Sequence, residues 1–124
     1  MITAKGGDNM NAVVLAAPIV PGKMDGWKEF SRDLHEGARH SDFVAFIKKS
    51  GLSRVRCWLQ QGPEGALALI LYEGETPAEF FKQIGTSQEP FAVWFRDGVK
   101  EFNGMDLAQP AGPPPELVSD VRAA

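Results

Sequence analysis

The sequence predicts one α+β domain with the element order βαββαβ. Three observations carry this prediction: an apolar run rich in valine opens the folded part, a glycine-containing loop joins two further strand-like runs, and stretches with helical spacing separate these strands. The chain has 124 residues, of which 44% are hydrophobic and 23% charged. This length and this composition fit a single globular domain.

The first strand is expected within residues 12–20, a short segment that is apolar on both faces. Pro18 then has to lie near the end of the strand or on an edge of the sheet, because proline has no N–H for a strand ladder. Residues 1–11 are polar and contain glycine, so we expect a flexible leader there. Pro21 and Gly22 predict a turn after the strand.

Two helical segments follow that turn. Trp27, Phe30 and Leu34 recur at a spacing that places them on one side of a helix. A second helix start at Ser41 leads to another apolar face, and Gly51 is a natural residue just after a helix end.

A β-hairpin is expected next, with strands at 53–61 and 66–73 and a four-residue loop at 62–65. Thr76 and Pro77 then form a helix start, with threonine as the cap and proline at the first helical position.

The last strong element is a helix with a continuous apolar stripe made of Phe91, Trp94, Phe95, Val99 and Phe102. Two segments are alternatives for the final strand, residues 105–108 and residues 116–121. We therefore place the domain at 12–108, followed by a proline-rich extension at 109–124 that could end in a strand.

This order is the split βαβ arrangement of ferredoxin-like folds, with helices on one face of an antiparallel sheet. The other face is expected to remain apolar, since Trp58, Ile70 and residues of the first strand are assigned to it. A homodimer through facing sheets is the simplest cover for that face. The alternative is a monomer with a ligand groove or an apolar open face.

Three stretches resemble the dimeric α/β-barrel superfamily, which includes antibiotic biosynthesis monooxygenases and EthD-like proteins. They are residues 21–30 after the first strand, residues 55–65 leading into 72–73, and residues 90–95 leading through 104–107. The likeness is to a branch without an assigned activity, and it covers about residues 12 to 107. The resemblance implies a ferredoxin-like protomer, a dimer built by sheet packing, and a cavity between the sheet and the helices of each protomer.

Composition excludes several classes of function. The net charge of −3 disfavours nucleic-acid binding, which demands a basic surface. A single cysteine, Cys57, excludes an internal disulfide and a cysteine-rich zinc site. Neither His35 nor His40 has the spacing of a metal-ligand pair, and no nucleotide-binding motif occurs, so we expect no metal and no cofactor. No targeting or membrane segment is apparent, which predicts a cytoplasmic protein without a membrane partner.

His40, near Arg39 and Asp42, is the candidate catalytic residue, as a general base at the mouth of a helix–sheet cavity. The alternative for His40, and for His35, is a solvated surface histidine.

Arg56 and Trp58 share a strand face with Arg54 and Gln60, an arrangement that suits an anionic or planar ligand. The same residue types are common anchors of a dimer interface. Tyr72 on the neighbouring strand is a further ligand-binding candidate. The alternative is that Tyr72 and Glu73 are simply partners of these arginines.

Trp27 and Trp94 belong to an aromatic set that is typical of a core but also compatible with a flat apolar pocket. Cys57 is expected to pack as a small hydrophobic residue. Three functions follow: binding of a small apolar or aromatic molecule between sheet and helices, a cofactor-independent monooxygenase-like enzyme, or a structural dimer without a ligand. In the enzyme, His40 is the base, and Arg56 or Trp58 orients the substrate.

Overall fold

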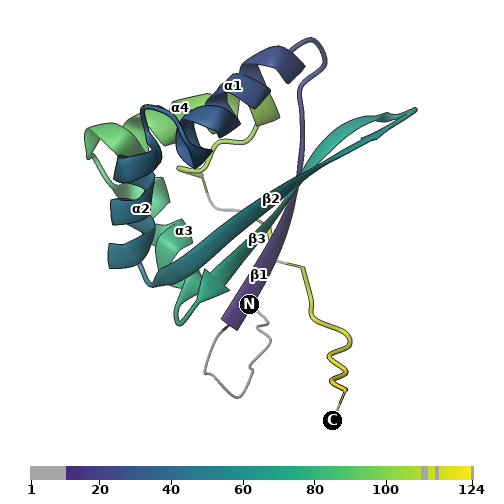
Figure 1. Ribbon diagram of the computed structural model, residues 1–124, viewed down its shortest axis with the longest axis vertical. Helices are drawn as coiled ribbons and strands as arrows, with labels where there is room; N and C mark the ends of the chain where they lie inside the picture. The colour runs from purple at the N-terminus through teal and green to yellow at the C-terminus, as the bar shows by residue number, and fades with distance from the viewer. Residues whose placement is uncertain (1–10, 110–111, 114, 124) are drawn as a thin grey trace.

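Four helices cover one face of a three-stranded antiparallel sheet in the computed structural model, which describes residues 11–109, 112, 113 and 115–123 (Figure 1). The predicted α+β class is therefore confirmed. The elements in chain order are β1 (Asn11–Pro18), α1 (Met24–His35), α2 (His40–Lys49), β2 (Leu52–Gly62), β3 (Gly65–Gly74), α3 (Pro77–Thr86) and α4 (Pro90–Asn103).

The sheet has the order β1-β3-β2, so the last strand of the hairpin lies in the centre. The hairpin turns at Gly65, whose φ of 123° favours glycine. Pro18 ends β1, which is an edge strand, as its missing N–H requires. The β2–β3 hairpin extends well beyond the helix layer (Figure 1).

The register of the hairpin corrects one sequence-based assignment. Cys57 pairs with Ile70, and Trp58 pairs with Leu69. Since paired residues of antiparallel strands share a face, Ile70 faces the helices and not the open side. The open face instead carries Leu67, Leu69 and Leu71 beside Trp58, so it is more apolar than the sequence suggested.

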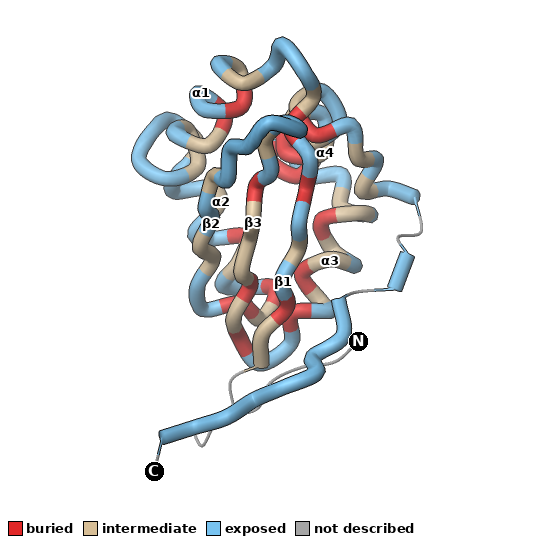
Figure 2. The backbone as a smooth tube through the Cα atoms, turned by 90° about the vertical axis from the view of Figure 1, so that its right-hand side faces the viewer, coloured by how far each residue is buried: buried red, intermediate tan, exposed pale blue. Residues whose placement is uncertain are grey.

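Neither alternative for a fourth strand is formed in the described residues. At 105–108 an Asx turn replaces extended chain, because the Asp106 carboxylate accepts a hydrogen bond from the Ala108 N–H at 3.0 Å. The described residues from 112 to 123 have no regular structure, and Figure 2 shows them exposed as they run away from the helices. The flexible leader was predicted for residues 1–11. Residues 1–10 lie outside the described residues, and Asn11 is the first residue of β1.

Two helices, α1 and α4, pack through a reciprocal contact between rings and glycines. The Phe30 ring of α1 lies on Gly98 of α4, and the Phe102 ring of α4 lies on Gly26 of α1. A Cβ atom at either glycine would overlap the opposing ring. Phe30 also packs against Trp94 of α4, with ring centroids 4.9 Å apart, so α1 is attached mainly to α4 and not to the sheet.

The main core is an aromatic cluster between α2, α3, α4 and one end of the sheet. Phe80 is at its centre, 1% exposed, and its ring contacts Phe46, Tyr72, Phe81 and Phe95. A smaller cluster at the opposite end of the sheet joins Trp27 to Ala17 of β1, Ala68 of β3 and Ile19, which follows the end of β1. These two clusters fix the helix layer at its two ends.

We expect Gly98→Ala to destabilise the protein by about 1–2 kcal/mol, although alanine is the better helix former by about 1 kcal/mol. The added methyl group overpacks the Phe30 ring, which costs about 1–3 kcal/mol in a packed core. In a Phe30→Val background the ring is gone, and the same substitution should stabilise. Urea unfolding of the four proteins of this cycle measures the coupling, and equal effects of Gly98→Ala in both backgrounds would contradict the ring-on-glycine contact.

Candidate functional site

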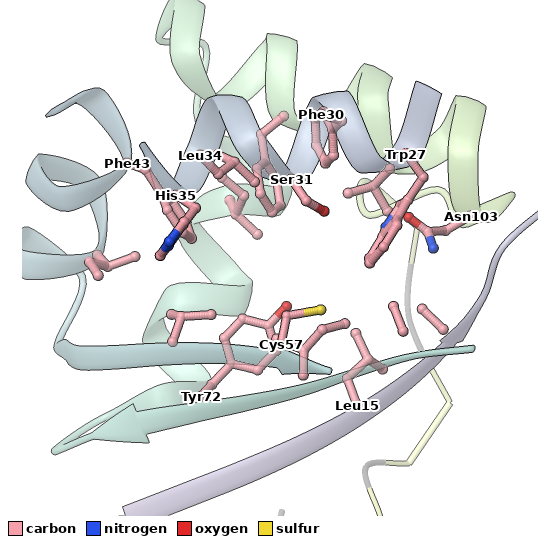
Figure 3. A pocket seen from close by; sticks show the side chains of 18 of the residues that line it. Leu15, Trp27, Phe30, Ser31, Leu34, His35, Phe43, Cys57, Tyr72 and Asn103 are labelled. Carbon is pink, nitrogen blue, oxygen red and sulfur yellow. The ribbon is translucent and has the colours of Figure 1, made fainter. Parts of the chain in front are cut away.

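A cavity of about 650 Å³ lies between the sheet and the helix layer (Figure 3). Its floor is the helix-facing side of the sheet, and its ceiling is α1. Residues of α2, α3 and α4 close it at the sides. We call this cavity the chamber.

The floor of the chamber is mostly apolar. It is made of side chains from the three strands that alternate toward the helices, namely Leu15, Ala17, Val55, Leu59, Ala68 and Ile70. The alternation follows from the two-residue period of a strand. A surface of this kind binds carbon-rich molecules better than water.

The chamber opens beside β2. Cys57 points to the helix side of the sheet and is nevertheless exposed, while Val55 and Leu59 on the same face are only half-buried. Trp27 reaches the sheet at one end, and α2 packs on β2 at the other. Between these two contacts α1 packs on α4 and stands off the sheet, so in the described residues no helix packs directly on the middle of β2.

One stripe of α1 supplies polar groups to the ceiling. Trp27, Ser31 and His35 follow one another at intervals of four residues, and therefore lie on one helix face. Figure 3 shows all three extending from α1 toward the sheet. Trp27 is buried, Ser31 is half-buried, and His35 is exposed at the mouth.

Tyr72 supplies the main polar group of the floor. The residue is only 5% exposed, and its ring packs against Phe80 and Phe81 with centroids 5.4 and 4.8 Å away. Figure 3 shows its hydroxyl directed into the chamber beside the Cys57 sulfur. Within the described chain no hydrogen-bond partner faces this hydroxyl.

Burial sets the protonation of both groups on the floor. Desolvation raises the pKa of Tyr72 far above its ordinary value, and the nearby Cys57 raises it further. Desolvation of the partly buried thiol also raises the pKa of Cys57. Both side chains are therefore protonated at neutral pH, and both can donate a hydrogen bond into the chamber.

His40, the residue expected to act as a base, lies at the rim. It is exposed, and its Nδ1 donates a hydrogen bond to the Leu34 carbonyl at 3.0 Å. This bond ties the first residue of α2 to the end of α1. Arg39 and Asp42 form an ion pair at 3.8 Å next to it.

Three of the six residues singled out from the sequence lie elsewhere. Arg56 and Trp58 are on the opposite face of the sheet, where Arg56 pairs with Glu73 at 2.9 Å and lies 5.5 Å from the Trp58 ring centre. Trp94 lies on α4 between Phe30 and Arg39, outside the chamber. Trp27, Tyr72 and His40 do line it.

Sequence reasoning missed Ser31 and the inward position of His35. The signal was present, because both residues follow Trp27 at the helical interval of four. The adjacent stripe through Phe30 and Leu34 is more apolar, and it alone predicts the core-facing side of α1. Cys57 was assigned to the correct face but lines the mouth of a cavity and not a closed core.

The described residues hold no group of three or more His, Cys, Asp or Glu side chains able to bind a metal ion. None of the helices found there is long and apolar enough to cross a membrane. Comparison with protein-family models, with curated proteins and with solved structures finds no match to this chain.

Tyr72 is the single tyrosine of the chain, so its titration can be followed by tyrosinate absorbance. We expect the native protein to titrate above the ordinary tyrosine pKa of about 10, and the urea-unfolded protein to titrate near it. Since the folded pKa is the higher one, stability is fully present below about pH 10 and falls as the pH rises toward the folded pKa.

Urea unfolding between pH 8 and 11 should therefore show a loss of stability that Tyr72→Phe reduces. Native titration at the ordinary pKa would mean that the ring is not buried as described.

Proposed function

We propose that this protein binds a small apolar or aromatic molecule in the chamber between the sheet and the helices. The observation that carries the proposal is the chamber itself, whose volume of about 650 Å³ lies within the range of roughly 300–1,000 Å³ usual for ligand sites. Its walls are mainly carbon, and a few polar groups from α1 and β3 converge on it. That combination is typical of a binding pocket.

Binding is favoured over the monooxygenase-like reaction by three features of the site. Tyr72 and Cys57 are held in their protonated forms, which are weak bases and nucleophiles. His40 lies exposed at the rim of the chamber, away from the buried polar groups of the floor. The proposed orienting residues, Arg56 and Trp58, are separated from the chamber by the sheet.

We further propose that the protomer is ferredoxin-like and forms a homodimer through its open sheet face. Exposed Val14, Trp58 and Leu67 support this, at 47%, 50% and 37% exposure, because a surface of this kind favours burial against another protein. The Arg56–Glu73 pair beside Trp58 adds charges of both signs to the same face. The unpaired edge of β1 is where a ferredoxin-like fold has its fourth strand.

Ligand binding is tested with N-phenyl-1-naphthylamine, an uncharged aromatic probe whose fluorescence rises in apolar surroundings. We expect saturable binding to the native protein and at least tenfold weaker binding to Cys57→Trp, because the indole ring would fill the chamber from β2. Gln60→Trp is the matched control, since it places the same ring on the other face of the same strand.

If the probe binds both variants as well as the native protein, the chamber is not its site. If it fails to bind the native protein at all, the proposed function is wrong.

Dimerisation is tested by sedimentation velocity at micromolar concentration. The native protein should sediment at twice the chain mass of 13.5 kDa, and Trp58→Glu should sediment as the monomer, because the carboxylate would be buried without a partner. Val118→Glu, on a side chain that is 84% exposed in the C-terminal segment, is the control. A native protein that sediments as the monomer would refute the dimer.

A further inference from the structure

We propose that the ligand carries an uncharged oxygen acceptor, such as the carbonyl of an apolar ketone, aldehyde or ester, and that the Tyr72 hydroxyl binds this oxygen. The inference rests on the proposed function and narrows the class of ligand. It concerns the polar groups that line the chamber, because a purely apolar ligand would make no use of them.

Two donors in the chamber lack an acceptor within the described residues. The Tyr72 hydroxyl comes from the floor, and the Trp27 indole comes from the ceiling, where the ring extends toward the sheet (Figure 3). Both residues are more than nine-tenths buried, with 5% and 7% exposure. An indole N–H can only donate a hydrogen bond. Both donor atoms remain accessible from the chamber, so a ligand that offers an acceptor oxygen there gains affinity if it satisfies them in place of water.

The acceptor should be uncharged. The fixed charges that line the chamber are Lys28 and Arg32 of α1 and Glu36 just after its end, and all three are exposed. The floor around Tyr72 is formed by Val55, Ile70 and the rings of α3, none of which can balance a buried carboxylate. A carbonyl oxygen accepts a hydrogen bond at a smaller cost of desolvation than a carboxylate does.

Cys57 supports the same assignment. Its sulfur lies beside the Tyr72 hydroxyl, and its only hydrogen bond among the described groups is a long one, 3.8 Å to the Trp58 carbonyl. The protonated thiol is a weak second donor at the position where the acceptor would lie.

The test compares 2-acetylnaphthalene with 2-ethylnaphthalene, which have nearly the same shape but differ in the carbonyl oxygen. Each displaces N-phenyl-1-naphthylamine from the native protein and from Tyr72→Phe. We expect Tyr72→Phe to weaken the ketone about fivefold, the effect of one net hydrogen bond, and to leave the hydrocarbon unchanged. Circular dichroism checks that the variant is folded.

A second readout needs no variant. The carbonyl stretch of 2-acetylnaphthalene in the native protein should lie at lower frequency than in hexane, because a hydrogen bond weakens the C=O bond. A stretch at the hexane frequency, or equal effects of Tyr72→Phe on both compounds, would overturn the proposal. The proposal would also be overturned if Tyr72→Phe weakened the binding of 2-naphthoate and not that of the ketone, since that would indicate an anion site.

These outcomes are distinct from failure of the proposed function. If the native protein binds the fluorescent probe but does not prefer the ketone through Tyr72, only the ligand class is wrong. If it binds neither the probe nor the naphthalenes, the binding function is wrong, and this inference falls with it.

Discussion

The contact between α1 and α4 determines how far the helix layer stands from the sheet. Phe30 and Phe102 each lie on a glycine of the opposite helix, which lets the two backbones approach closely while their rings fill the space between them. Helix α1 therefore satisfies its apolar stripe on α4. Its next stripe, with Ser31 and His35, is left over the middle of β2 without a packing partner, and the chamber is the volume that results.

A second constraint is that one helix layer cannot cover two faces of a sheet. The inner face packs against the aromatic cluster around Phe80, which is the largest fully buried side chain of the described residues. The outer face has the same leucine-rich β3 at its centre, with Trp58 on one side and Val14 on the other. The Arg56–Glu73 ion pair interrupts this surface, and in the proposed homodimer these two charges would help to set the relative orientation of the two copies.

The sequence was most informative where local chemistry decides the structure. Pro77 begins α3 and Gly51 follows α2 with a φ of 90°, as the sequence predicts, because only local backbone geometry is involved. The register of the β2–β3 hairpin was harder to predict. Ile70 and Leu69 are equally suited to either face of the sheet until their partners Cys57 and Trp58 are known. A cavity between the sheet and the helices was expected from the family resemblance alone. Its lining could not be derived from residue spacing, because it depends on which of two neighbouring stripes of α1 meets α4. That choice is made by Gly98, almost seventy positions after Phe30, by Gly26 on α1 itself, and by the rings that lie on these two glycines.

Tyr72 contributes to the packed core through its ring and to the proposed ligand site through its hydroxyl. Its ring belongs to the aromatic cluster, so its position is fixed by Phe80 and Phe81 whether or not the chamber is filled. Its hydroxyl lies beyond that cluster, and phenylalanine would fill the core equally well without burying an oxygen. A polar atom kept in a core where an apolar residue fits as well is a local inconsistency of the kind that functional sites show. The rigid ring fixes the position of the hydroxyl in advance, so the proposed binding would require no reordering of the floor.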